Sequence, residues 1–345
     1  MRDDTLNRIA RIVERRLARV FDEAQAGSAT GLFPGASRSP VMDQVRDLTM
    51  RSGKRVRAAL LVCGAGLFDA EAERDPAVIA AAAAMELLHT YFLIHDDIMD
   101  DDPTRRGGLS AHAALAAGLG DEKLGRDLAI LAGDLAVALH EGLLAGLAAP
   151  DQRRRLAARI FADMHLDVVH GQTMDLLNTG DAEEVARRKT ASYTTVGPLA
   201  AGAALAGASE ADVEELADIA RPLGVAFQLR DDLLGVFGDP EVTGKPVGTD
   251  LRAGKATFLI REGLGRGDAG QRAAIEAVFG DAEAGVEAVR AAASALAESG
   301  ARGACEERID QLVEAALRDL ARRCYLPEGR LFLEHIAGMV RRWPE

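Results

Sequence analysis

A long apolar stretch that runs directly into a cluster of carboxylates places the strongest limit on the fold of this chain. The eighteen residues 77–94 are almost entirely apolar, and five aspartates then fall within residues 96–102. A helix of that length could cross a membrane. Its embedded Glu86 and His89, its many alanines and its acidic end instead favour the buried core helix of a soluble protein. We therefore expect no stable membrane insertion.

The acidic cluster has the spacing of a metal site. In a helix, Asp96 and Asp100 lie one turn apart, as do Asp97 and Asp101. Like charges at this spacing cost roughly 0.2–0.5 kcal/mol per pair in an isolated helix, and a divalent cation would remove that cost. Ligands that are all oxygen indicate Mg²⁺ or Mn²⁺, which often bridge carboxylates to a substrate phosphate. The alternative is a frayed helix end with solvated charges.

Composition favours an all-α protein. The 345 residues are 48% hydrophobic but only 4% aromatic, and Ala and Leu, which are helix formers, dominate the apolar set. No linker or fixed-period repeat divides the chain. We expect one domain, 1–345, of about a dozen helices around an apolar cavity: an N-terminal helix and loop (1–40), a core carrying the motifs (about 45–260) and C-terminal helices (261–345).

Charge and cysteine content exclude several classes of function. A formal net charge of −13 argues against a nucleic-acid surface. The cysteines, Cys63, Cys305 and Cys324, show no metal-binding spacing and are expected to be buried thiols in a reducing compartment. The N-terminus has no signal-peptide core. These features indicate a cytoplasmic protein.

The helical pattern divides the chain into segments with recognisable ends. A kink is expected at Gly197-Pro198, and Ser209 with Asp212 is expected to cap the next helix. The expected helices are 4–24, 41–50, 58–68, 76–102, 109–118, 122–149, 151–177, 183–207, 210–237, 256–266, 269–279, 284–298, 302–323 and 328–342.

Two further groups of charged residues complement the acidic cluster. Residues 53–57 (Gly-Lys-Arg-Val-Arg) put cations at a helix start, where they oppose the helix dipole unless an anion is held there. A second aspartate pair, Asp231 and Asp232, lies late in another long apolar helix. If the two acidic helices face each other across a bundle, their carboxylates could hold metal ions and a diphosphate. Arg105 and Arg106 could then supply bidentate donors to phosphate.

These motifs together resemble the trans-type isoprenyl diphosphate synthases, the polyprenyl synthetase family with the all-α isoprenoid synthase fold. The match consists of Gly53-Lys54-x-x-Arg57, His89, Asp96-Asp97-x-x-Asp100, Arg105-Arg106-Gly107, Gly171-Gln172-x-x-Asp175, Lys189-Thr190, Phe227-Gln228-x-x-Asp231-Asp232, Gly244-Lys245-Pro246 and Asp250-Leu251-x-x-Gly254-Lys255. Each motif alone is weak, but their joint occurrence in the family's order is specific.

The resemblance implies a Mg²⁺-dependent prenyltransferase and a role for each matching residue. The product would be a C15–C20 (farnesyl or geranylgeranyl) diphosphate, made from isopentenyl diphosphate and an allylic diphosphate, by an enzyme that is usually a homodimer. Three Mg²⁺ would be bound by Asp96, Asp100 and Asp231, with Mn²⁺ as the other candidate ion. The catalytic set would be Asp96, Asp97, Asp100, Arg105, Lys189, Asp231, Asp232 and Lys245. The substrate-binding set would be Lys54, Arg57, His89, Arg105, Arg106, Lys189, Thr190, Gln228, Lys245 and Lys255.

Product length and one metal ligand are less clear from the motifs. Tyr91 and Phe92 lie roughly 6–8 Å before Asp96 along a helix axis, and in the family bulky residues there form the floor of the pocket. Gly235 stands where the fuller family pattern has a third aspartate, and Asp239 is a candidate substitute. Thr190 and Gln228 could instead be ordinary core hydrogen-bonding residues.

Two alternatives to this function remain. One is a class I terpene cyclase of the same fold, which would not need the set Lys54, Arg57, His89 and Arg106. The other is a non-catalytic subunit of a heteromeric synthase, which only the incomplete second aspartate cluster favours.

Overall fold

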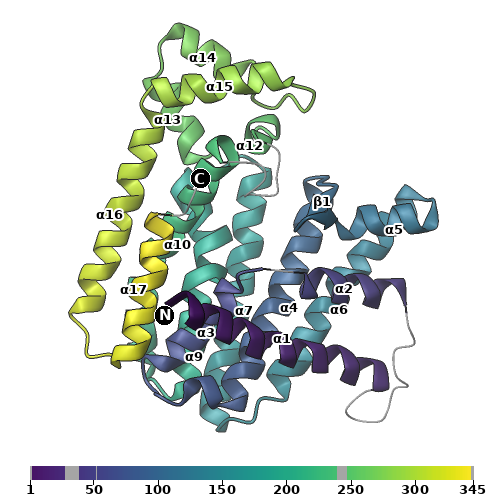
Figure 1. Ribbon diagram of the computed structural model, residues 1–345, viewed down its shortest axis with the longest axis vertical. Helices are drawn as coiled ribbons and strands as arrows, with labels where there is room; N and C mark the ends of the chain where they lie inside the picture. Colours follow the sequence, from purple (N-terminus) through teal and green to yellow (C-terminus); the bar gives the residue numbers. More distant parts are fainter. Residues whose placement is uncertain (1, 28–38, 52, 239–246, 343–345) are drawn as a thin grey trace. The chain divides into compact units, whose positions relative to one another are not determined.

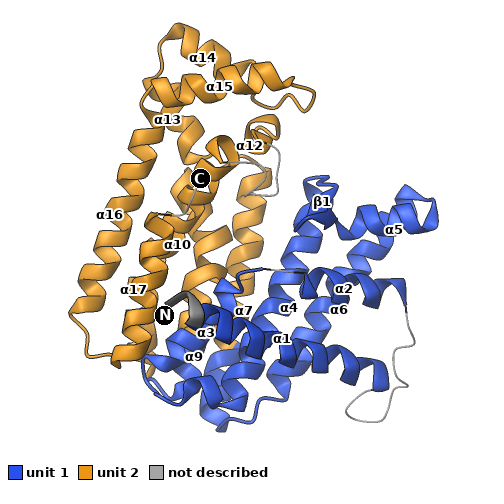
Figure 2. Cartoon of the chain, viewed as in Figure 1, with its two compact units in different colours: residues 1–158, 201–208 blue, residues 159–200, 209–345 orange. Residues whose placement is uncertain are grey.

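The computed structural model describes residues 2–27, 39–51, 53–238 and 247–342. Within these residues the chain is helical, apart from loops and one two-stranded hairpin (Figure 1), so the all-α prediction is confirmed. The chain divides into two compact units (Figure 2): unit 1 is 1–158 with 201–208, and unit 2 is 159–200 with 209–345. That the whole chain is one domain stays a prediction.

The helices lie close to the expected ranges, with a few short additions. In chain order they are α1 (Arg2–Ala26), α2 (Pro40–Met50), α3 (Val56–Gly66), η1 (Ala72–Arg74), α4 (Pro76–Met99), α5 (Ala111–Leu119), α6 (Glu122–Ala145), α7 (Asp151–Leu176), α8 (Ala182–Val185), η2 (Ala186–Val196), α9 (Gly197–Ala206), α10 (Glu210–Phe237), α12 (Thr249–Arg252), α13 (Phe258–Arg266), α14 (Ala269–Glu276), α15 (Val286–Glu298), α16 (Ala301–Ala321) and α17 (Pro327–Arg341).

The starts of the motif-bearing helices are set by side-chain caps. The Asp75 carboxylate accepts the N–H of Ala77 at 2.7 Å, and Pro76 occupies the first helical position of α4. At α10, Ser209 and Asp212 form a reciprocal capping box, which confirms the cap expected there. These caps fix where each helix begins and hence which side chains reach its far end.

Helix α4 is the core helix of unit 1. It packs against α3 and α6, and its residues from Ala81 to Thr90 are all buried. Among the described residues, α4 and α6 are both long and apolar enough to span a membrane, but 72% of the apolar window of α4 is buried within the protein. The apolar stretch is therefore accounted for by packing.

The end of α4 and the segment after it differ from the expectation. The helix was expected to reach Asp102, but it ends at Met99, and Asp101 has a left-handed backbone (φ 54°) that reverses the chain. Strands β1 (Thr104–Arg105) and β2 (Gly108–Leu109) then pair antiparallel. Arg106 (φ 51°) and Gly107 (φ 72°) form their two-residue turn, the geometry that suits the twist of a hairpin.

Two other expectations were incomplete or wrong. The kink expected at Pro198 is preceded by a whole π-helical segment, η2, which carries Lys189 and Thr190. π-Helical turns often occur at functional sites. Cys63 and Cys305 are buried as predicted, but Cys324 is exposed, because it follows the end of α16 rather than lying inside a helix.

Candidate active site

The first aspartate cluster in unit 1 separates into outward and inward carboxylates. Asp96 and Asp100 are half-buried and lie one turn apart at the end of α4, where the Asp100 N–H donates to the Asp96 carbonyl at 2.8 Å. Asp97 is fully buried. The predicted roles of Asp96 and Asp100 as metal ligands and of Asp97 as a catalytic residue stay predictions.

Arg105 is held by the inward carboxylates. Its Nε donates to Asp97 Oδ1 at 2.7 Å, and its Nη2 donates both to that atom and to Asp102 Oδ2, the latter at 3.0 Å. Burial lowers the pKa of Arg105, but the hydrogen bonds and charge of Asp97 outweigh it, so the pKa lies above its ordinary value. Asp102 is therefore part of this network.

Asp97 retains one oxygen without a partner. Among the described residues, Asp97 Oδ2 is buried and has no hydrogen bond. Burial raises the pKa of this carboxyl to about 6, against the lowering effect of Arg105. A buried carboxylate oxygen without a donor is costly, and a nearby cation would reduce that cost.

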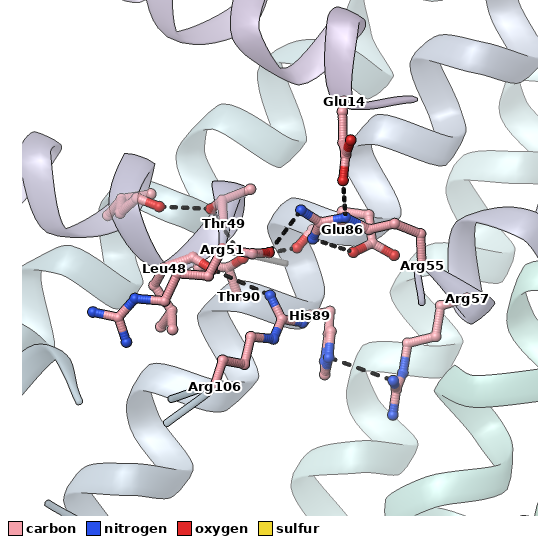
Figure 3. Close-up of polar contacts among 11 residues, drawn as sticks. Glu14, Leu48, Thr49, Arg51, Arg55, Arg57, Glu86, His89, Thr90 and Arg106 are labelled. Carbon is pink, nitrogen blue, oxygen red and sulfur yellow. Dashed lines mark hydrogen bonds and ion pairs between the residues drawn. The ribbon is translucent and has the colours of Figure 1, made fainter. Parts of the chain in front are cut away.

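The basic residues of unit 1 gather beside the middle of α4 (Figure 3). Arg57 Nη1 lies 3.4 Å from His89 Nε2. Burial, and then the charges of Arg57, Arg106, Arg105 and Arg55, hold the pKa of His89 well below its ordinary value. His89 is therefore neutral at neutral pH and accepts a hydrogen bond from Arg57 at Nε2. Lys54 precedes α3 and is exposed.

Arg106 leaves the hairpin turn and reaches α2, where its Nη1 donates to the Leu48 carbonyl at 3.1 Å. Burial lowers its pKa to about 10, and the Glu86 charge opposes the repulsion of the other arginines. Arg106 is thus still a cation at neutral pH. In unit 1 the structure brings together Arg57, His89 and Arg106. Their predicted role in binding a substrate, together with Lys54, stays a prediction.

The second aspartate cluster, in unit 2, also has one outward and one inward carboxylate. Asp231 is exposed on α10, and Asp232 is buried. Burial and then the charge of Asp250 raise the pKa of Asp232 well above its ordinary value, with Gln228 acting in the opposite direction. Asp231 is the better placed of the two for a metal ion.

Polar residues of η2 and α10 join in one chain of hydrogen bonds. Thr190 Oγ1 donates to Gln228 Oε1 at 2.5 Å, and Gln228 Nε2 donates to Asp232 Oδ1 at 2.7 Å. Lys189 Nζ donates to Asp175 Oδ2 at 2.5 Å. Thr190 and Gln228 therefore have hydrogen-bond partners within unit 2, as core hydrogen-bonding residues would. Their contact with substrate stays a prediction.

Gly171 of α7 is explained by the close approach of η2. A Cβ at position 171 would lie 2.3 Å from the Lys189 backbone nitrogen, so the two segments can meet only where the side chain is absent. Within the Gly171-Gln172-x-x-Asp175 motif, Gly171 therefore allows the close packing of α7 and η2, and Asp175 accepts a hydrogen bond from Lys189.

Asp250 is the described carboxylate nearest to the position where the third aspartate is missing. A Cβ at Gly235 would lie 3.0 Å from Asp250 Oδ2, and the Gly248 N–H donates to the Gly235 carbonyl at 2.8 Å. Lys255 follows Asp250 in this loop, and its N–H donates to the Asp250 carbonyl. Asp239 and Lys245 lie outside the described residues.

Comparison with known proteins decides the family. The polyprenyl synthetase family matches residues 39–296 of this chain. The chain belongs to the polyprenyl synthetase family, whose members are prenyltransferases. The family match spans all the motifs singled out from the sequence.

Individual relatives support the assignment. The chain is 33% identical to the geranylfarnesyl diphosphate synthase of Aeropyrum pernix over 288 residues, which are 80% of this chain and 85% of that protein. Its fold is similar to that of the geranylgeranyl pyrophosphate synthase of Corynebacterium glutamicum, solved with isoprenyl diphosphate and magnesium. The TM-score is 0.90 at 32% identity, over 97% of this chain and 99% of that one.

A polyprenyl synthase from Caulobacter crescentus CB15, solved with calcium and isoprenyl diphosphate, gives a TM-score of 0.82 at 27% identity. That match covers 98% of this chain and 97% of the other. The resemblance inferred from the motifs is thus confirmed for family and fold, while the roles of individual residues stay predictions.

The donor sets of this chain fit a divalent metal ion. Asp96 and Asp100 offer adjacent, half-buried carboxylates, and the unpartnered Asp97 oxygen lies in the same cluster. Among the described residues, no group of three or more His, Cys, Asp or Glu side chains could hold a metal ion alone. Mg²⁺ suits such a site, because it commonly takes one or two carboxylates and completes its shell with water and substrate phosphate.

The residues that support the basic cluster were not predicted from the sequence. Arg51 Nη1 donates to the carbonyls of Arg105 and Leu109, both at 2.8 Å, and so ties α2 to the hairpin. Arg55 and Glu86 form a buried ion pair beneath it. A charged residue inside an otherwise apolar helix, as Glu86 is, was the available signal.

Proposed function

We propose that this protein is a short-chain prenyltransferase that joins an allylic diphosphate head-to-tail to isopentenyl diphosphate and yields a C15–C20 diphosphate. The observation that carries the proposal is the set of Arg57, Arg106 and neutral His89 beside α4, the helix that ends in Asp96 and Asp100. A cation group for a second diphosphate next to a metal-binding carboxylate pair suits two diphosphate substrates. A terpene cyclase has one.

The geometry of α4 supports separate substrate-binding and metal-binding positions along one side of the helix. His89, Phe92, Asp96 and Asp100 follow one another at three- or four-residue steps, so their side chains leave the same side. His89 and Asp96 are seven residues apart, or about 10 Å along the axis. The proposed site for the second substrate and the two proposed metal ligands Asp96 and Asp100 thus share one helix.

Asp96 and Asp100 are proposed to hold Mg²⁺, and Asp231 is proposed as a further Mg²⁺ ligand. When bound, the ions would neutralise the allylic diphosphate and make it a better leaving group. Three ions are expected, and Mn²⁺ is a possible substitute. The magnesium and calcium in the two solved relatives support the use of a divalent ion.

The chain's own residues would then orient the two substrates and stabilise the charge that develops on the diphosphate. Arg105, held by Asp97 and Asp102, and Lys189, held by Asp175, present fixed positive charge where diphosphate charge develops. Lys245 and Lys255 are proposed for the same task, and Thr190 and Gln228 as polar contacts. As the allylic C–O bond breaks, the double bond of isopentenyl diphosphate, bound by Lys54, Arg57, His89 and Arg106, forms the new C–C bond. Proton loss to the released diphosphate restores a double bond.

Product length is proposed to depend on Phe92 more than on Tyr91. Phe92 lies one turn before Asp96 on the proposed substrate side of α4. The Tyr91 ring packs edge-on against His95 at 4.7 Å, and His95 Nε2 lies 3.3 Å from the Ile130 carbonyl of α6. Tyr91 therefore leans towards α6, and Phe92 is the better candidate for the floor of the pocket.

A homodimer in the cytoplasm is the proposed assembly and location. Helix α6 packs on α4 and α5, yet it exposes Leu124, Ile130 and Leu131, the last at 53%. A second copy of this chain could cover these side chains. Light scattering should give a dimer mass, and Leu131→Glu should shift it towards a monomer.

Product analysis tests the proposed reaction. The protein would be incubated with Mg²⁺, isopentenyl diphosphate and each of the C5, C10 and C15 allylic primers, and the products sized by mass spectrometry. C15–C20 products support the proposal. Cyclic products released without consumption of isopentenyl diphosphate would favour the cyclase. No product with any primer would favour the non-catalytic subunit.

A further inference from the structure

A buried ion pair adjoins the basic cluster, and neither of its residues belongs to the predicted substrate-binding set. Arg55 Nη1 donates to Glu86 Oε2 at 3.1 Å, and the two side chains are only 1% and 2% exposed. Figure 3 shows Arg55 between Glu14 and Glu86. Burying two charges is costly unless both groups are well paired and hydrogen-bonded. A role for the pair would explain why the charges are buried here.

Arg55 adopts a backbone conformation that its side chain must maintain. It precedes α3 with φ 49° and ψ 38°, the left-handed region that a residue with a side chain rarely occupies. Its guanidinium also donates to the Arg51 carbonyl at 3.1 Å and to Glu14 Oε1 at 3.3 Å. These contacts join the ends of α2 and α3 to α1 and α4.

The strained residue lies between two proposed substrate-binding residues. Lys54 comes immediately before Arg55, and Arg57 comes two residues after it in the first turn of α3. The direction in which these two side chains leave the backbone therefore depends on the conformation of Arg55. Releasing Arg55 would let both turn away.

Glu86 acts on the other half of the cluster. It lies one turn before His89 on α4 and supplies the attractive charge that Arg106 meets, while Arg55, Arg57 and Arg105 repel it. Arg106 in turn packs under Gly53, where a Cβ would lie 3.8 Å from the guanidinium carbon. Glu86 thus keeps several like charges together in a small volume.

We propose that Arg55 and Glu86 are positioning residues for a diphosphate bound by Lys54, Arg57, His89 and Arg106. They do not touch the substrate. Arg55 fixes the backbone that presents Lys54 and Arg57, and Glu86 holds Arg55 and balances the charge of the cluster. This inference rests on the proposed function and identifies residues that the proposed substrate set leaves out.

Steady-state kinetics on Glu86→Gln and Arg55→Lys test the proposal. Each variant should raise KM for isopentenyl diphosphate by about tenfold, with kcat and KM for the allylic primer within about twofold of wild type. Glu73→Gln is the matched control, because Glu73 pairs with Arg8 in an exposed bridge from η1 to α1 and should change none of these constants. Equal losses in kcat and both KM values, or no change in any, would overturn the proposal.

Binding of inorganic diphosphate, measured by calorimetry on the same variants, separates this inference from the proposed reaction. If wild type binds diphosphate and Glu86→Gln binds it about tenfold more weakly, the positioning role holds even without turnover. If both bind equally, the positioning role is refuted whatever the catalytic result. Thermal unfolding identifies any variant that fails to fold; Arg55→Lys, which keeps its charge, then decides the question.

Discussion

Arg57 Nη1 lies 3.4 Å from His89 Nε2, and the buried histidine can accept that hydrogen bond only while it is neutral. The pKa of His89 lies well below its ordinary value, so the unfolded chain binds this proton at a higher pH than the native state. The free energy of unfolding should therefore fall by up to about 1.4 kcal/mol per pH unit as the pH drops below about 6.5.

Denaturant titrations between pH 7.5 and pH 5 measure how the free energy of unfolding depends on pH. His89→Gln should remove the part of that dependence that comes from protonation of His89. An unchanged pH profile in the variant would show that His89 is protonated in the native state as readily as in the unfolded chain.

Asp96→Asn and Asp100→Asn should each lower kcat/KM about a hundredfold or more, because each removes a proposed metal ligand. Asp101→Asn is the control. Its carboxylate is 70% exposed and pairs with Arg126, so activity should stay near wild type. Equal losses in all three variants would argue that overall charge, not ligation, is what matters.

Phe92→Ala should lengthen the product by at least one five-carbon unit, because it removes bulk one turn before Asp96 on the proposed substrate side of α4. Tyr91→Ala should have a smaller effect, since that ring packs against His95. Mass spectrometry of the products with one fixed primer compares them. A longer product from Tyr91→Ala alone would place the floor of the pocket on the α6 side.

Gly235→Asp, which restores the family's third aspartate, should destabilise the protein and leave activity no higher. The new Cβ would lie 3.0 Å from Asp250 Oδ2, and adjacent carboxylates repel. We expect a loss of roughly 1–2 kcal/mol. Adding Asp250→Asn should recover much of the stability, and thermal unfolding of the two variants tests this.

Chelation by EDTA should abolish turnover and leave helical content unchanged. The carboxylates proposed as ligands lie at helix ends or on exposed faces, and the described core consists mainly of apolar side chains. Circular dichroism and product assays before and after readdition of Mg²⁺ or Mn²⁺ check both parts. Unfolding on chelation would mean that the metal ion is structural.

Helix positions were largely predictable because the apolar periodicity and the caps at Asp75 and Ser209 are local signals. The hairpin after α4 was not predicted. Its strands have two residues each, too short for any alternation pattern, and its turn has Arg106 where Asn or Asp is usual. The π-helical form of η2 also has no clear local signature. It accompanies the close contact between Gly171 and Lys189.

The carboxylates and cations of the candidate site were predictable by type, because the motifs occur together in order. Which of them face inward was not. Asp96 and Asp97 are neighbours of identical chemistry, and burial of Asp97 depends on Arg105, eight residues away across a turn. No role was predicted for Arg55, because it lies among other cations in the sequence. Its importance comes from Glu86, 31 residues distant in sequence.

His89, Phe92 and Asp96 lie on one continuous helix, α4, and Asp100 is its C-cap. This limits which insertions and deletions the gene can tolerate. Substitutions alter one position at a time, but inserting or deleting one residue between 89 and 96 would rotate one end by about 100° relative to the other. Homologues should therefore keep the length of this stretch even where they differ in residue type at its other positions, and length variation should be confined to the loops on either side.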